Sequence, residues 1–312
     1  MYIGIDIGGT KCAVILGDGE LRVKEKIRFD TASVNETLSR IYEAVESLMC
    51  DGVRGIGISC GGPLDEERGV ILSPPNLPDW DEIHITDELE RRFGVPAALR
   101  NDANACAIAE YRFGAGKESR NMVFLTFGTG LGAGLILNGK LYSGSSGMAG
   151  EVGHIRLAED GPVGYGKRGS FEGFCSGGGL AQLGRTLAER RLAEGTPTAF
   201  CKSRAELDNI TAKLLAEYAS AGDPDAKSVF DLCASRLGEG LSLIVDIINP
   251  DRIVIGSIYQ RCEGLLAPRM NEILKKEALA PSLSVCRVVP AALGDKIGDV
   301  AALSVAIDSF GG

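Results

Sequence analysis

The sequence predicts an α/β protein in which one hairpin unit occurs twice. Two glycine loops carry this prediction, one at Gly8-Gly9-Thr10-Lys11 and one at Gly128–Gly134. Each loop follows a short apolar strand and leads into a second apolar strand, which is closed by an Asp-Gly or an Asn-Gly turn. Such dipeptides between apolar runs are typical of β-hairpins. The repeat predicts an internal duplication, although two tight turns in unrelated hairpins would give the same pattern.

Length and composition fit a soluble protein of two ordinary domains, or one large one, in a reducing cytoplasm. The chain has 312 residues, of which 45% are hydrophobic and 24% charged, and its net charge is −9. The acidic balance and the lack of long Lys/Arg runs argue against nucleic-acid or membrane partners. The nine cysteines form no C-x-x-C pair and are expected to be reduced thiols. No segment reaches the ~18 apolar residues of a membrane span, and the N-terminus does not look like a signal peptide.

The remaining elements alternate between helices and strands. Ser33 or Asn35 is expected to cap the first helix, and Gly94 to end the second. Residues 193–224 are broken by proline and glycine and fit either a lid or a helix-rich excursion. Periodicity predicts helices at 33–49, 85–94, 103–113, 177–195, 226–249 and 295–308, and strands at 53–60, 95–102 and 250–257.

The second glycine loop also fits a dinucleotide-binding fingerprint. Gly128-Thr129-Gly130-Leu131-Gly132-Ala133 matches G-x-G-x-x-A, and Glu151 follows about twenty positions later. That fingerprint needs a helix directly after the glycines, because the pyrophosphate binds at the helix N-terminus. Here Asn138-Gly139 predicts a hairpin turn instead. We therefore expect the two loops to present backbone N–H groups to the phosphates of a nucleoside triphosphate.

Two aspartates are placed to act on such a triphosphate. Asp6 ends the first strand beside the first loop, where a carboxylate can hold Mg²⁺ through water, although it could also cap a turn. Asp102 follows Asn101 at a strand end that begins a helix. A carboxylate there often only caps the helix. At the ligand-binding edge of an α/β sheet it can also take a proton from an attacking hydroxyl.

A third group of polar residues suits a polyhydroxylated acceptor. Glu151 and His154 stand three residues apart in a glycine-dense run, and Glu172 follows in Gly-Ser-Phe-Glu-Gly-Phe. The turn from Cys60 to Asp65 is a weaker candidate. A lone histidine is often an ordinary polar residue. Hydroxyl-binding side chains with close-approach glycines predict a sugar site.

Several motifs, taken together, resemble one protein family. They are DIGGTK, GIGISCGGPLD, PNLPDW, NDANACAIAE, GTGLGAG, GMAGEVGH and INPDRIVIGS, and they run from Gly4 to about Ala306 in the order of the ROK family of bacterial sugar kinases and sugar-responsive repressors. The resemblance implies the actin-like, hexokinase-type fold, a ribonuclease H-like duplication with an ATP cleft between two α/β lobes. It also implies a homodimer. The expected lobes are 1–115, with the helix at 296–312 packing back on it, and 116–295.

The resemblance also assigns roles residue by residue. Asp102 matches the catalytic base, and Asp6 belongs to the first phosphate motif. The family's adenosine motif usually reads VIGGG, whereas this chain has Val254-Ile255-Gly256-Ser257-Ile258. The implied ATP-binding residues are Asp6, Gly8, Gly9, Thr10, Lys11, Gly128, Thr129, Gly130, Gly132, Gly256 and Ser257. The implied sugar-binding residues are Gly62, Asn76, Asn101, Asp102, Glu151, His154 and Glu172.

These assignments predict ATP-dependent phosphorylation of a hexose or N-acylhexosamine, with glucose as the first candidate. Mannose, allose, fructose and N-acetylmannosamine stay open. One alternative is a sugar-sensing repressor, which would carry a winged helix-turn-helix extension before the first phosphate motif. We do not expect one, because the first strand begins at residue 2, the chain is acidic and Asp102 is present. Another alternative is a sugar-binding protein without turnover.

One departure from the family concerns zinc. Most members place C-x-C-G-x-x-G-C-x-E after the E-x-G-H motif, and its cysteines bind a structural zinc with the histidine. The corresponding positions here hold Val163, Tyr165 and Ser170. A structural zinc site needs four nitrogen or sulfur donors. We expect no zinc, and we expect Tyr165 and Phe171 to hold the loop by apolar packing.

Overall fold

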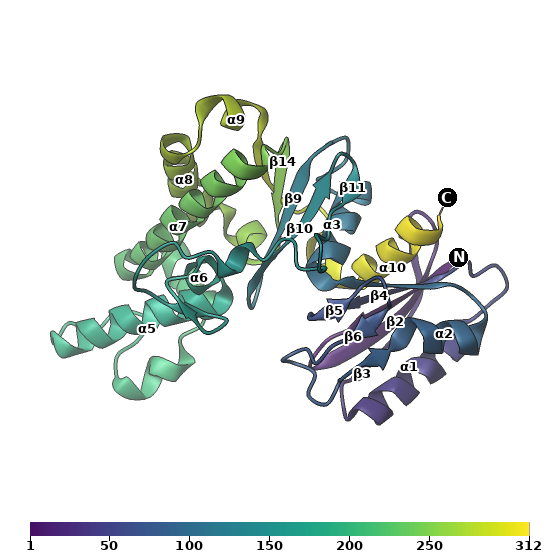
Figure 1. Ribbon diagram of the computed structural model, residues 1–312. Coiled ribbons are helices and arrows are strands. Elements are labelled where there is room, and N and C mark those ends of the chain that lie inside the picture. Colours follow the sequence, from purple (N-terminus) through teal and green to yellow (C-terminus); the bar gives the residue numbers. More distant parts are fainter. Residues whose placement is uncertain (312) are drawn as a thin grey trace. The chain divides into compact units, whose positions relative to one another are not determined.

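The computed structural model describes residues 1–311, for Asp295 the backbone alone, and the chain divides into two compact units (Figure 1). The first unit comprises Met1–Ser119, Gly134–Ala149 and Ala292–Gly312, and the second Arg120–Ala133 and Gly150–Ala291. Residues 134–149 thus group with the first unit, whereas the expected boundary put them in the second domain. Gly134 explains this grouping, because a Cβ there would lie 2.5 Å from Ala107 Cβ and 2.6 Å from Ala103 O.

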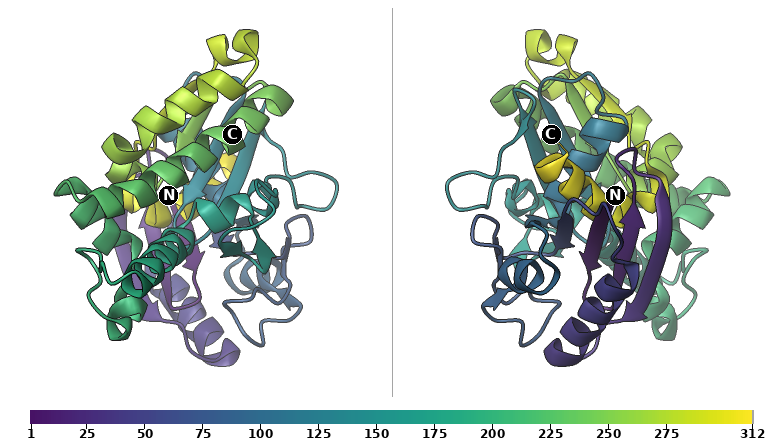
Figure 2. Two further views of the ribbon diagram at one scale, coloured as in Figure 1. Left: turned by 90° about the vertical axis from the view of Figure 1, so that its left-hand side faces the viewer. Right: turned by 90° about the vertical axis from the view of Figure 1, so that its right-hand side faces the viewer.

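The first unit is a five-stranded sheet covered by helices on both faces (Figures 1 and 2). Helices α1 (Val34–Leu48) and α2 (Ile85–Phe93) share one apolar cluster with the sheet, and α3 (Asp102–Phe113) and α10 (Ile297–Phe310) pack on the other face. The strand order is β3-β2-β1-β4-β8, and β1 pairs antiparallel with β2 and parallel with β4. The strands are β1 (Tyr2–Ile7), β2 (Lys11–Gly17), β3 (Val23–Asp30), β4 (Ile56–Cys60) and β8 (Ala97–Asn101).

Alternation along β1 places Asp6 on the α10 face of this sheet. Ile3, Ile5 and Ile7 belong to the cluster under α1, so Gly4 and Asp6 between them point the other way. Gly4 lets α10 approach closely, because a Cβ there would lie 2.6 Å from Leu303 N. Gly57 in β4 does the same, since its Cβ would lie 2.3 Å from Ala302 O. The last helix therefore packs on the strands that carry the first glycine loop.

Short elements complete the first unit. Strands β5 (Leu64–Asp65), β6 (Val70–Ile71) and β7 (Ile83–His84) form a small antiparallel sheet that the sequence pattern did not reveal, because each strand has only two residues. The hairpin of β10 (Leu131–Leu137) and β11 (Lys140–Leu141) turns at Asn138 (φ 52°) and Gly139 (φ 77°), which confirms the predicted tight turn. A 3₁₀ turn, η3, spans Gly294–Lys296.

The turn expected at Asp18-Gly19 is longer than a two-residue turn. It runs from residue 18 to residue 22, between the end of β2 and the start of β3. Asp18 Oδ1 accepts from the N–H groups of Glu20 and Arg22, both at 3.0 Å, and Leu21 takes the left-handed conformation. The aspartate side chain therefore organises the whole loop rather than one tight turn.

The second unit contains parallel strands β9 (Met122–Phe127), β14 (Arg252–Ile255) and β15 (Arg287–Pro290). Their sheet has the order β11-β10-β9-β14-β15, which repeats the order β3-β2-β1-β4-β8 of the first sheet. This correspondence confirms the predicted duplication. The remaining elements of the second unit are β12 (Val163–Gly164), β13 (Lys167–Arg168), η1 (Val152–His154), η2 (Arg204–Asn209), α4 (Phe171–Phe174), α5 (Gly177–Ala193), α6 (Ala212–Ser220), α7 (Pro224–Ile248), α8 (Ile258–Glu277) and α9 (Ala280–Val285).

Helices dominate the second unit. The long helices α7 and α8 lie side by side (Figures 1 and 2). The segment 193–224 contains η2 and α6, so it is a helical excursion that packs on α5 and α7. All nine cysteines are free thiols, and five of them are buried: Cys12, Cys60, Cys175, Cys201 and Cys233. Within residues 1–311, no helix combines the length and apolar character needed to cross a membrane.

Candidate functional site

The first glycine loop is a tight turn between β1 and β2. The N–H of Gly8 donates to Lys11 O at 3.1 Å, and a Cβ at Gly8 would lie 2.8 Å from that oxygen. Thr31 Oγ1 donates to Gly8 O at 2.6 Å and holds the turn from the β3 side. Gly9, Thr10 and Lys11 stay exposed at the tip. The loop therefore presents backbone and a lysine ammonium to solvent, as a phosphate site requires.

Asn76 and the Gly61-Gly62 turn lie beside this loop within the first unit. A Cβ at Gly9 would come within 2.6 Å of Asn76 O, so only glycine fits there. A Cβ at Gly61 would lie 3.8 Å from Asn76 Nδ2, and one at Gly62 would lie 3.2 Å from Asn101 Nδ2. The structure thus brings Gly62, Asn76 and Asn101, three of the predicted sugar-binding residues, into one neighbourhood.

Asn101 and Asp102 form the junction between β8 and α3. The N–H of Ala103 donates both to Asn101 Oδ1 at 3.0 Å and to Asp102 Oδ1 at 2.8 Å, so both side chains cap the helix. Capping does not exclude a role as a base, because it engages only one carboxylate oxygen of Asp102.

Two neighbouring carboxylates of the first unit act on the carboxyl group of Asp6. Burial, followed by the charges of Asp102 and Asp299, raises the pKa of Asp6 to about 7, against the opposing effect of Lys26 and Arg28. Asp102 has accessible surface, yet desolvation of its carboxyl raises its pKa too, and the N–H groups at the start of α3 oppose that rise. Accumulated negative charge of this kind favours a bound cation or proton.

Among the described residues, no group of three or more His, Cys, Asp or Glu side chains is arranged to hold a metal ion.

The second glycine loop joins β9 to β10 in the second unit. The N–H of Gly128 donates to Gly130 O at 3.1 Å, and Gly132 N–H donates to Thr126 Oγ1 at 2.9 Å. Leu131 N–H donates to Glu172 Oε2 at 2.9 Å, and a Cβ at Gly130 would lie 2.7 Å from the same oxygen. Glu172, expected to bind sugar, therefore fixes the end of the second glycine loop through one of its oxygens.

The segment with Glu151 and His154 packs on the first residues of β10. A Cβ at Gly153 would lie 2.1 Å from Leu131 O and 3.3 Å from Glu172 Cβ. The side chains of Glu151 and His154 remain exposed on either side of this contact. The second unit thus brings Glu151, His154 and Glu172 to one edge of its glycine loop.

The loop that lacks the family's cysteines is a β-hairpin. Tyr165 (φ 42°) and Gly166 (φ 73°) form its turn, so the Tyr165 side chain points outward and is 75% exposed. The expected packing role is wrong for Tyr165 but confirmed for Phe171, which is fully buried. Ser170 is also buried, and its Oγ accepts from Gly173 N–H at 3.0 Å to cap α4. The hairpin pairing, the Ser170 cap and the buried Phe171 together hold this loop.

The start of α5 also belongs to the second glycine loop. The N–H of Gly177 donates to Gly128 O at 2.8 Å, and Ser176 Oγ caps the helix by accepting from Gly179 N–H at 3.0 Å. The N-terminus of a helix attracts phosphate. The sequence pattern at Gly177-Gly178-Gly179 predicts only a helix, although three glycines at a helix start are also typical of a close approach to another segment.

The altered adenosine motif lies next to the same loop. Ser257 adopts φ 56° and ψ −113°, a positive-φ conformation that favours glycine and costs a serine roughly 1–3 kcal/mol. A Cβ at Gly128 would lie 3.6 Å from Ser257 Oγ, which accepts from Arg261 Nη2 at 3.3 Å. The serine therefore keeps the backbone shape that glycine would give, and adds a hydroxyl held by Arg261.

Comparisons with known proteins agree with this arrangement. The ROK family model matches residues 2–309. A glucokinase of Streptomyces coelicolor is 32% identical over 98% of this chain and 97% of its own length. An N-acetylmannosamine kinase of Citrobacter koseri is 30% identical over 89% of this chain and 90% of its own.

Solved structures show the same relationship. A ROK family glucokinase from Streptomyces griseus, in complex with glucose and AMPPNP, superposes with a TM-score of 0.79 at 32% identity, covering 98% of this chain and 99% of that one. The α/β fold predicted from the sequence, of the two-lobed actin-like kind, is thereby confirmed. The chain belongs to the ROK family.

Proposed function

We propose that this protein is an ATP-dependent kinase that phosphorylates a hydroxyl of a hexose or an N-acylhexosamine. The observation that carries the proposal is the duplicated hairpin with its two glycine loops, the first of which lies beside Asp6 and Asp102. The names of the relatives, glucokinase and N-acetylmannosamine kinase, support the same reaction class. Glucose is the first candidate substrate, because the glucokinase relative covers almost the whole chain.

In this proposal Asp102 is the general base. Its raised pKa suits the acceptance of a proton from a sugar hydroxyl, and its place at the start of α3 fixes one carboxylate oxygen. The sugar ligands are Gly62, Asn76 and Asn101 of the first unit, with Glu151, His154 and Glu172 of the second. The two glycine loops, Lys11, Gly256 and Ser257 bind the nucleotide.

Asp6 is the proposed Mg²⁺ residue. Mg²⁺ prefers oxygen ligands and keeps several of its waters. The Asp6 carboxylate fits such a water-mediated contact, because burial and then the charges of Asp102 and Asp299 make its ionisation costly, and a nearby cation would relieve that cost. When bound, Mg²⁺ supplies positive charge to the phosphates during transfer.

A coupled assay of ADP release over a sugar panel tests the proposed function. With Mg²⁺ and ATP, we expect glucose to give the highest kcat/KM, followed by other hexoses or N-acetylmannosamine. A protein that only binds sugar would show a sugar-dependent rise in melting temperature without ADP release. ADP release that no sugar raises above the background would contradict the kinase assignment.

We also propose that the protein holds no structural zinc. Three family cysteine positions carry Val163, Tyr165 and Ser170, and the hydrogen bonds of Ser170 and the β12–β13 hairpin already fix the loop. Elemental analysis of protein purified without added chelator should find well under one zinc per chain, and activity should survive chelation once Mg²⁺ is restored. Stoichiometric zinc, lost together with activity, would overturn this expectation.

A further inference from the structure

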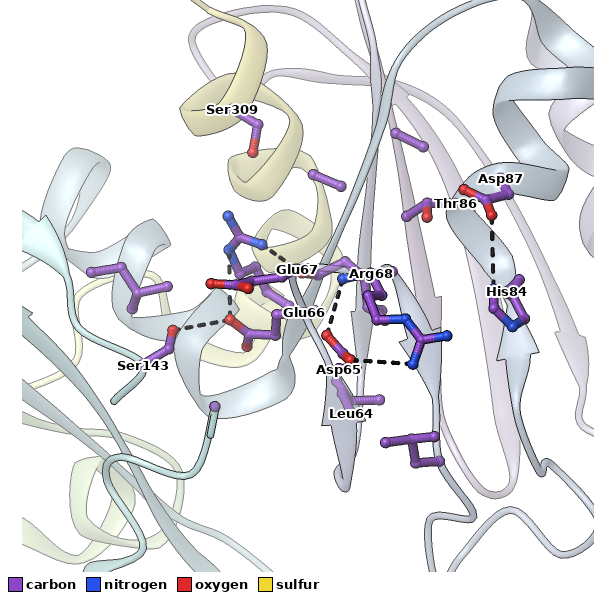
Figure 3. A pocket seen from close by; sticks show the side chains of 18 of the residues that line it. Leu64, Asp65, Glu66, Glu67, Arg68, His84, Thr86, Asp87, Ser143 and Ser309 are labelled. Carbon is purple, nitrogen blue, oxygen red and sulfur yellow. Dashed lines mark hydrogen bonds and ion pairs between the residues drawn. The ribbon is translucent and has the colours of Figure 1, made fainter. Parts of the chain in front are cut away.

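A buried glutamate links the β5–β6 segment to the helix that begins with Asp102. Glu66 lies on the wall of a cavity of about 1250 Å³ within the first unit, together with Ser143 and Arg100 (Figure 3). Only 8% of the Glu66 side chain is exposed. A carboxylate buried to this extent is costly unless charge-assisted hydrogen bonds or ion pairs compensate it.

The bonds of Glu66 converge on the β8–α3 junction. Its Oε1 accepts from the backbone N–H of Asn101 at 2.8 Å and from Nδ2 of Asn104 at 2.9 Å. Its Oε2 accepts from Ser143 Oγ at 3.0 Å and lies 3.9 Å from Arg100 Nε, which gives the group a partner of opposite charge. One carboxylate oxygen therefore holds the residues on either side of Asp102. The other oxygen is anchored away from them by Ser143, a contact that Figure 3 shows.

The position of β8 in the sheet explains why this acceptor is needed. β8 is the edge strand after β4, so the N–H groups on its outer side have no neighbouring strand. Glu66 supplies the missing acceptor at Asn101, the last residue of the strand. Asn104 is itself buried in the first turn of α3, so its bond to Glu66 sets the rotation of that turn.

We propose that Glu66 is a positioning residue that fixes Asn101 and Asp102 in the orientation needed for phosphoryl transfer. The inference rests on the proposed function, in which Asp102 is the base and Asn101 a sugar ligand. Glu66 does not touch the reacting atoms; it acts through the Asn101 N–H and the Asn104 amide. Small displacements of a reacting group are costly, since an error of about 1 Å can lower the rate about 100-fold.

Kinetics of Glu66→Ala, Glu66→Asp and Glu66→Gln test this role, with Glu67→Ala as the matched control. Glu67 is the exposed neighbour in the same segment, and its variant should behave like the wild type. Glu66→Ala and the shorter Glu66→Asp should lower kcat about 10- to 100-fold and raise the sugar KM several-fold, with the KM for ATP unchanged. Glu66→Gln should recover most of the activity, because its amide oxygen can accept both bonds made by Oε1.

This pattern separates positioning from a general loss of structure. A smaller folded fraction would lower the apparent kcat and leave both KM values unchanged, and it would not be rescued specifically by glutamine. Such a result, or wild-type kinetics for both Glu66→Ala and Glu66→Asp, would overturn the proposal. Glu66→Asp keeps the charge and is the variant to use if Glu66→Ala does not fold.

Hydrogen–deuterium exchange tests the same contact without any need for activity. In Glu66→Asp, the amides of residues 101–104 should exchange at least several-fold faster than in the wild type, while those of β9 should not change. Unchanged exchange at 101–104 would overturn the positioning role even in an active kinase. A wild type that phosphorylates no sugar would instead overturn the proposed function, and faster exchange would still support the contact of Glu66 with the junction.

Discussion

Replacing Asp102 with asparagine should lower kcat by about 10²- to 10⁴-fold and leave the fold and sugar binding nearly intact. Asparagine has the same shape as aspartate but cannot accept a proton at neutral pH. The start of α3 should keep its cap, because the N–H of Ala103 also donates to Asn101 Oδ1. The loss should therefore fall on the chemical step and spare ground-state binding.

Steady-state kinetics with the preferred sugar, together with calorimetric titration of that sugar, measure the two effects separately. Asp51→Asn is the matched control, since Asp51 is exposed in a turn of the same unit. In the wild type, kcat/KM should fall as the pH drops, because a base must be ionised. The raised pKa of Asp102 places that fall above the usual range of an aspartate. Turnover close to that of the wild type in Asp102→Asn would remove Asp102 from the role of base.

The parts of this site that could be predicted from the sequence are those with local signals. Asn138-Gly139 predicted the hairpin, because both residues tolerate the left-handed conformation that the turn needs. Asp6 could be placed because it lies near the end of a strand, just before a glycine turn, and the strand periodicity decides its face. Asn101 and Asp102 were found for the same reason, as a polar pair at a strand-to-helix junction.

The contacts that were missed join segments far apart in the sequence. Glu66 accepts a hydrogen bond from Asn101, 35 positions away, and Gly177 at the start of α5 donates one to Gly128. Neither contact can be recognised from sequence periodicity, because each depends on how helices and strands pack once they have formed. Tyr165 shows the opposite error, in which a large aromatic residue suggested burial although the positive φ of its turn directs the side chain outward. Local conformation overrode hydrophobicity there.

Replacing Asp6 with asparagine should abolish most activity and, at the same time, stabilise the protein above neutral pH. The loss of activity should be about 10²- to 10³-fold, as for other groups that stabilise charge in the transition state, because a neutral amide holds hydrated Mg²⁺ less well. The gain in stability follows from the unfavourable surroundings of the carboxylate: burial and the charges of Asp102 and Asp299 oppose its ionisation in the folded state.

The sign of the pH dependence follows from the two pKa values of Asp6. Its pKa rises from 3.8 to about 7 on folding, so the folded protein binds the proton more tightly than the unfolded chain. This contribution to stability is fully present below pH 3.8 and is lost as the pH rises through about 7. The difference between the two values corresponds to at most about 4 kcal/mol at 1.36 kcal/mol per pKa unit. Asparagine carries no charge at any pH and avoids that loss.

Thermal unfolding without nucleotide and with a chelator measures the effect. At pH 8, Asp6→Asn should melt above the wild type by about 2–4 °C for each kcal/mol regained, and the gap should narrow at pH 5, where the wild-type carboxyl is protonated. Asp51→Asn should show no such pH dependence. Added Mg²⁺ should raise the wild-type melting temperature at pH 8 more than that of Asp6→Asn, because the cation acts on the same charge. Equal stability of the two proteins at pH 8 would mean that ionising Asp6 costs the folded protein no free energy. The argument that Asp6 attracts Mg²⁺ would then fail.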